Sequence, residues 1–98
     1  MRFEWDRDKA ASNLLKHGVG FEEAATAFDD PDHFIKQDRD HSTENEIRMW
    51  LIGRSALETV VLVVFTIREN GAVYRLISAR KANREERTNY ERLKNARP

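Results

Sequence analysis

Residues 59–81 read TVVLVVFTIRENGAVYRLISARK, and this stretch decides the fold. The run from Thr59 to Ile67 is almost continuously apolar, which is typical of a central strand buried on both faces. The dipeptide Asn70-Gly71 follows and is a strong hairpin signal, because both residues tolerate positive φ. The run from Val73 to Lys81 then returns as a second strand. The sequence therefore predicts an antiparallel strand pair at the centre of a sheet.

The segment before this pair predicts one short strand and two helices. Phe3 and Trp5 alternate with polar residues, as in a strand with one buried face. Asp6 is suited to cap the first helix, which Lys16-His17-Gly18 would end, with cations near the C-terminal dipole and glycine in a left-handed exit. A second helix is expected from Phe21 to Phe28, before the acidic turn at 29–32.

The remaining segments predict two more strands and a last helix. We expect a short strand over 33–37 and another over 47–54, separated by a polar loop. Asn83, with Glu86 three residues later, is a capping-box start for the final helix. The order β-α-α-β-β-β-β-α predicts an α+β fold in one domain over residues 1–98. Its antiparallel sheet would have three to five strands, two N-terminal helices and one C-terminal helix.

Charge is divided unequally along the 98 residues, although the formal net charge is zero. Residues 1–49 carry 7 Lys and Arg against 12 Asp and Glu, a net charge of −5, and residues 50–98 carry 10 against 5, a net charge of +5. This division indicates a cationic surface built by the C-terminal half, for which polyanions are the natural ligands. The absence of cysteine excludes disulfides and thiolate metal sites.

No segment of the sequence has the character of a signal peptide or a membrane span. The N-terminus lacks an apolar h-region, and the longest apolar run, Val60 to Phe65, is far shorter than the ~20 residues that a membrane helix needs. We therefore expect a cytoplasmic protein with no membrane contact.

Three blocks of sequence carry a resemblance to a known family. They are EWDRDKAASNLLKHGVGFEEAATAF at 4–28, the pattern DHS…E.R…IGRS within 40–55, and ISARKANREERTNYE at 77–91. Together they resemble the BrnT toxins of bacterial type II toxin–antitoxin modules, over residues 3 to 91. The resemblance implies a RelE-like fold, RNA cleavage, and silencing by a BrnA-like antitoxin in a 2:2 assembly. It also implies that operator DNA is bound only through the antitoxin complex.

Cleavage of RNA without a metal needs fixed cations at the phosphate, and two arginines are suited to this role. Arg80 ends its strand at an exposed rim, so we expect it to hold the scissile phosphate; the alternative is an ion pair with Glu86 or Glu85. Arg54 follows Gly53 at another strand end and would make a second phosphate contact, unless it is a surface arginine after a turn. The catalytic set expected on this basis is Arg80, Arg54, His17 and His41.

His17 and His41 compete for proton transfer, which a histidine performs near neutral pH. His17 also fits an ordinary helix end, and His41 lies in a loop where Asp38 or Asp40 would orient its ring. Further phosphate contacts are expected from Lys16, Lys81 and Arg84. Strand alternation places Arg80 and Lys81 on opposite faces, so they would not enter one pocket without a twist or bulge.

Neither a metal nor another cofactor is expected. The acidic clusters at 29–33 and 38–41 lack the spacing of an EF-hand or a zinc site and read as solvated turns. Phe65 stands where relatives are expected to carry Tyr or His. That difference keeps open a second hypothesis, a catalytically silent RNA- or protein-binding module of the same fold.

Overall fold

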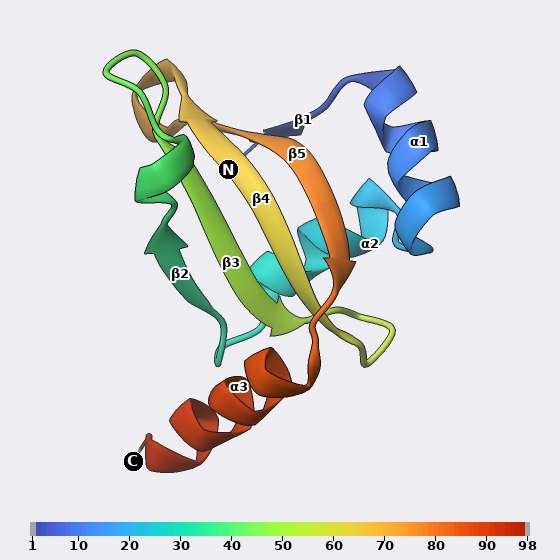
Figure 1. Ribbon diagram of the computed structural model, residues 1–98, viewed down its shortest axis with the longest axis vertical. Coiled ribbons are helices and arrows are strands. Elements are labelled where there is room, and N and C mark those ends of the chain that lie inside the picture. The colour runs from blue at the N-terminus through green and yellow to red at the C-terminus, as the bar shows by residue number, and fades with distance from the viewer. Residues whose placement is uncertain (1, 98) are drawn as a thin grey trace.

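The computed structural model describes residues 2–97 and contains a five-stranded sheet with three helices (Figure 1). This is the α+β arrangement that the sequence predicted. None of the described helices is long and apolar enough to cross a membrane. The strands and helices are β1 (Arg2–Glu4), α1 (Arg7–His17), α2 (Phe21–Thr26), β2 (Phe34–Gln37), β3 (Arg48–Arg54), β4 (Val60–Arg68), β5 (Val73–Lys81) and α3 (Arg84–Ala96).

The sheet is mixed, with strand order β1-β5-β4-β3-β2. Strands β2 to β5 are antiparallel to their neighbours, as expected, but β1 joins β5 in parallel, with Phe3 opposite Tyr74. The wholly antiparallel sheet expected from the sequence is corrected in this respect. In the sequence, two helices lie between β1 and the other strands. In the structure the Phe3 ring packs on Phe28 and Tyr74, at centroid distances of 4.9 and 6.1 Å. This long-range packing places β1 at the edge.

The central hairpin forms where the sequence predicted it. Strand β4 pairs with β3 and β5, and its residues Val60 to Val63 are buried. The turn between β4 and β5 is a single 3₁₀ turn, Glu69–Gly71, in which Asn70 and Gly71 have φ values of 55° and 93°. Asparagine and glycine tolerate this left-handed backbone at the lowest cost, so they place the turn.

A bulge in the central pair changes which face the end of β5 presents. The register shifts between Val64 and Phe65, so that Val64 lies opposite Ser78 whereas Phe65 lies opposite Leu76. Strict alternation along β5 would place Leu76 and Arg80 on one face. The bulge instead turns Leu76 toward the helix-covered core and leaves Arg80 on the other face.

Helix α1 is fixed at both ends and at its middle. The Asp6 carboxylate accepts hydrogen bonds from the backbone N–H groups of Asp8 and Lys9, and Gly18 ends the helix with φ 71°. Buried Asn13 donates to the carbonyls of Val19 and Ala79, at 2.9 and 2.8 Å, and accepts from the Ala79 N–H at 3.0 Å. Its amide thus fills the place of a neighbouring strand along the open edge of β5.

The larger core lies between the sheet and helices α1 and α2. Both Ala24 and Phe21 of α2 are fully buried there, and the Trp5 ring meets the Phe21 ring edge-on at 5.9 Å. The buried members of this core are Val19, Phe21, Ala24, Ala27, Leu51, Val61, Val63, Phe65, Leu76 and Ala79.

Helix α3 covers one end of the opposite face of the sheet (Figure 1). It begins with the expected capping box, in which the Asn83 side chain accepts from the Glu86 N–H and Glu86 accepts from the Asn83 N–H. Tyr90 is fully buried against Ile52, Val60 and Leu62. The rest of this face, toward β2 and the start of β3, is left uncovered by helices.

Tyr90 also anchors α3 through its hydroxyl, which donates to the Asp30 carboxylate at 2.6 Å. Burial, and then this hydrogen bond to a carboxylate, raise the pKa of Tyr90 to about 12. Burial alone would raise the pKa of Asp30, but hydrogen bonds from Tyr90 and from the N–H groups of Arg54 and Asp32 outweigh burial and lower the pKa. Asp30 therefore joins α3 to the end of β3 as an ionised acceptor.

Substituting Tyr90→Phe is expected to lower the free energy of unfolding by about 1.5–3 kcal/mol near pH 7, because a hydrogen bond to a carboxylate is lost. Since the folded-state pKa of Asp30 lies below its ordinary value of 3.8, this stabilisation is present above that pH and is lost as pH falls through the lowered pKa. Urea unfolding of both proteins over a series of pH values from 7 downward measures the difference. A gap that stays constant as the pH falls would contradict the role given to Asp30.

Candidate functional site

A cavity of about 440 Å³ opens on the face of the sheet that α3 leaves free, and we call it the sheet cavity. It reaches from the end of α1, across β5, β4 and β3, to the end of β2, and the first turn of α3 closes one side. Its lining residues are His17, Asp38, Trp50, Leu62, Val64, Ser78, Ala79, Arg80 and Glu86. Two of the residues expected to act in catalysis, His17 and Arg80, therefore share one cavity.

Arg80 is held in this cavity by Glu86. The guanidinium donates from Nη1 to Oε1 at 2.8 Å and from Nη2 to Oε2 at 3.0 Å, a bidentate pair between β5 and the first turn of α3. The hydrogen bond from Arg80 keeps the pKa of Glu86 below its ordinary 4.5, against the effect of burial, and the same pair raises the pKa of Arg80. The expected alternative, an Arg80–Glu86 ion pair, is thus present, and it leaves the cation at the cavity wall.

His17 reaches the cavity from the C-terminus of α1. The bond between Asn13 and Ala79 ties this helix to the edge of β5, and Gly18 turns the chain away after His17. Lys16 and His17 also line a neighbouring hollow with Ile77 and Ser78, so Lys16 lies beside the sheet cavity rather than in it.

His41 lies outside the lining but bonds to a residue within it. The Nδ1 atom of His41 is 2.9 Å from one oxygen of Asp38 and 3.0 Å from the other, and the side chain is otherwise exposed. Asp38 is therefore the acid that orients His41, as the loop sequence had suggested alongside Asp40.

Trp50 supplies the aromatic ring of the sheet cavity. It projects from β3 onto the free face, is half-buried, and carries the Lys36 ammonium 5.6 Å from its ring centroid. A ring and a cation on an open sheet face are suited to stack an unpaired base and to hold a phosphate. The sequence analysis did not assign this role to Trp50.

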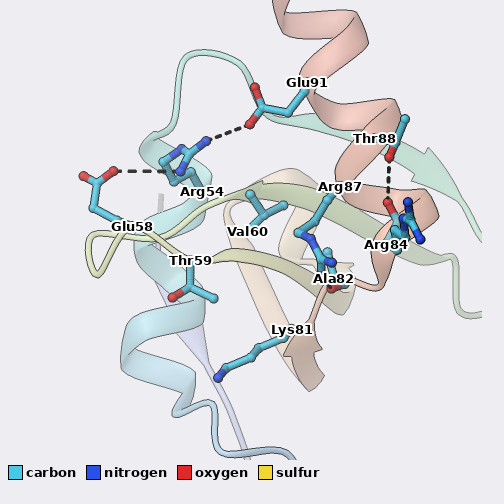
Figure 2. Close-up of a pocket in the computed structure, with 10 residues that line it drawn as sticks. All are labelled: Arg54, Glu58, Thr59, Val60, Lys81, Ala82, Arg84, Arg87, Thr88 and Glu91. Atoms are coloured by element: carbon cyan, nitrogen blue, oxygen red, sulfur yellow. Dashed lines mark hydrogen bonds and ion pairs between the residues drawn. The ribbon is translucent and has the colours of Figure 1, made fainter.

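A second depression, of about 590 Å³, lies between α3 and the turn that joins β3 to β4, and we call it the α3 groove (Figure 2). Arg54, Lys81 and Arg84 all line it, together with Arg87. Arg54 and Arg80 were expected to grip one phosphate, but they line different cavities. Lys81 and Arg84 are likewise separated from Arg80, and for Lys81 strand alternation had predicted this.

Arg54 is committed to contacts within the α3 groove. Its guanidinium donates to Glu91 at 2.8 Å and approaches Glu58 at 4.0 Å, as Figure 2 shows, and it lies 5.7 Å from the Tyr90 ring centroid. The expectation that Arg54 binds the scissile phosphate is not supported by this geometry, because α3 draws its side chain away from the sheet cavity.

Two further sequence expectations concern Phe65 and metals. Phe65 is fully buried in the helix-covered core, with its ring centroid 5.1 Å from that of Phe28 and 5.0 Å from that of Tyr74. It points away from the sheet cavity, so a Tyr or His at this position would add no group to that cavity. Within residues 2–97, no three His, Asp or Glu side chains are placed to hold a metal ion together.

Sequence reasoning missed Asn13, which ties α1 to the edge of β5 one turn before His17. A signal was present, since Asn13 is a polar residue on the helical stripe of Ala10 that faces the sheet. A polar side chain at such a position needs buried partners, and the backbone of an open strand edge provides them.

The fold has a counterpart among solved structures. The structure is similar to the crystal structure of the Brucella abortus ribonuclease toxin BrnT, with a TM-score of 0.64 and 21% sequence identity, over 86% of this chain and 99% of that chain. No curated protein sequence gives a significant match.

The family follows from the sequence itself. Residues 5–86 match the model of the BrnT family, described as the ribonuclease toxin of type II toxin–antitoxin systems. The chain belongs to this family. As a type II toxin it has a protein antitoxin as its partner.

Proposed function

We propose that the protein is an endoribonuclease that cleaves RNA without a metal, in the sheet cavity. The observation that carries this proposal is the meeting of His17 and Arg80, from the end of α1 and the end of β5, in one open cavity beside Trp50. A histidine, a fixed guanidinium and an aromatic ring are the groups that such a reaction and its substrate call for.

In the proposed reaction the ribose 2′-oxygen loses its proton and attacks the adjacent phosphorus, and the bond from phosphorus to the 5′-oxygen breaks. The products are a 2′,3′-cyclic phosphate and a 5′-hydroxyl, which receives a proton. Arg80 binds the phosphate and stabilises the charge that develops on its oxygens. It does so with guanidinium N–H groups other than the two that donate to Glu86, so the bidentate pair keeps the side chain in place during the reaction.

His17 is the group proposed to move protons next to Arg80, because its ring lines the same cavity. His41 is the second histidine considered for this role, and Asp38 holds it at the far side of the sheet cavity. Lys16, at the neighbouring hollow, is proposed to contact phosphate along the same strand of RNA. Arg54, Lys81 and Arg84 are left out of this cleavage site, since they line the α3 groove.

We propose that the antitoxin is BrnA-like, neutralises the toxin in the cytoplasm, and brings operator DNA to the complex. The family's type II character supports a protein antitoxin. The other hypothesis, a silent binding module, rested on Phe65, and the burial of that ring in the core gives it no support.

Incubating the purified protein with single-stranded RNA in EDTA tests the proposed function. We expect fragments with 2′,3′-cyclic phosphate ends, and a fall in rate of about 10²-fold or more for His17→Ala, because a positioned acid or base contributes on this scale. His41→Ala is the matched variant and is expected to have the smaller effect. Folded wild type that releases no fragment from any RNA would favour the binding module.

A further inference from the structure

The α3 groove differs from the sheet cavity in what lines it. One stripe of α3, carrying Arg84, Arg87 and Glu91, forms one wall, and the residues around the β3–β4 turn form the other (Figure 2). Val60 and Ala82, both buried, form an apolar floor. The groove therefore offers charged walls above an apolar base.

The cations of the groove are only partly neutralised. Arg54 forms an ion pair with Glu91 and lies near Glu58, so these three side chains form a local network. Arg87 donates to the Ala82 carbonyl at 2.6 Å and keeps its charge. Within residues 2–97, no carboxylate lies within 4.0 Å of Lys81, Arg84 or Arg87. The walls thus present an excess of positive charge to a ligand.

This lining suits a protein segment better than RNA. None of the ten residues around the groove is aromatic, and Tyr90 beneath it is fully buried, so no ring is available to stack a base. Glu58 and Glu91 on the rim are unfavourable neighbours for a phosphate chain. A peptide supplies carboxylates to the cations, backbone donors to the acids, and apolar side chains to the floor.

We propose that the α3 groove is a docking site for a segment of the antitoxin that carries carboxylates next to apolar side chains. The proposal rests on the family's antitoxin partner and on the assignment of RNA cleavage to the sheet cavity. Its consequence is that the antitoxin has an anchor outside the catalytic cavity, on a stripe of α3 that does not include Glu86, the partner of Arg80.

Charge reversal at two exposed cations of the groove, Lys81 and Arg84, tests the proposal. We expect Lys81→Glu and Arg84→Glu each to weaken binding of the antitoxin by about tenfold or more, because each places like charges in contact. Arg7→Glu is the matched control: Arg7 is also exposed and is the first residue of a helix after an Asx cap, but it lines neither cavity. It is expected to change antitoxin binding by less than about threefold. Isothermal titration of each purified toxin variant with the antitoxin encoded beside it gives these affinities.

Titration of the same variants with an uncleavable 2′-O-methyl RNA shows whether the groove binds a protein segment or RNA. We expect Arg84→Glu and Arg7→Glu to weaken RNA binding equally, as two reversals of one surface charge. If Lys81→Glu and Arg84→Glu weaken the binding of RNA but not the binding of the antitoxin, the groove binds RNA and the proposal is overturned. Equal losses of antitoxin affinity for Arg84→Glu and Arg7→Glu would overturn it as well. Antitoxin binding needs no RNA cleavage, so a wild type that cleaves nothing would remove the proposed function and leave this test intact.

Discussion

Arg80→Ala is expected to lower the rate of RNA cleavage by about 10²–10³-fold, the usual cost of removing one fixed donor from a developing oxyanion. The Arg80 guanidinium lines the sheet cavity together with His17, and Glu86 already fixes it at two points. Arg80→Lys keeps the charge but loses the fork, so we expect an intermediate rate. The measurement is the initial rate of fragment release from labelled RNA by each purified variant.

Arg75→Ala provides the control for this prediction. Arg75 is an earlier arginine of β5, and its guanidinium contacts Glu4 at 3.4 Å, away from the sheet cavity. Its removal is expected to leave the cleavage rate within about threefold, since an ion pair of this exposure contributes little. Growth arrest on induced expression should follow the same order. Cleavage by Arg80→Ala at the wild-type rate would remove Arg80 from the mechanism and shift attention to Lys16 and His17.

Local signals in the sequence were sufficient for most of the framework. Asp6, Gly18 and the Asn83–Glu86 capping box act within a few residues of their own position, so each helix end followed from neighbouring side chains. The central hairpin likewise followed from Asn70-Gly71 between two apolar runs. These features are local, and sequence patterns report local structure well.

The features that the sequence did not predict depend on contacts between distant segments. The parallel docking of β1 on β5 joins residues about seventy positions apart, and no turn signal encodes it. The bulge at Val64 and Phe65 breaks the period of two on which face assignment rests. The separation of Arg54 from Arg80 follows from Glu91 and Tyr90, which reach β3 only once α3 has folded back.

Asn13→Ala is expected to lower the free energy of unfolding by about 2–4 kcal/mol, because it leaves buried backbone groups without partners. The amide of Asn13 serves the Val19 carbonyl and both the N–H and the carbonyl of Ala79. Water has little access to replace it, since Asn13 and Ala79 are buried. Urea unfolding followed by circular dichroism gives the free energy, and RNA cleavage by the folded variant reports whether His17 has moved.

The sign of this effect separates two views of Asn13. Alanine is the better helix former by about 0.5 kcal/mol, so if Asn13 served only α1, replacing it with alanine would stabilise the protein. If Asn13 instead closes the open edge of β5, the replacement would destabilise the protein by several times that amount. Ser12→Ala, at the exposed neighbouring position, measures the helix term alone and is expected to change stability by less than about 0.5 kcal/mol. If Asn13→Ala matches Ser12→Ala, the amide does not hold α1 to the sheet, and another contact must place His17 beside Arg80.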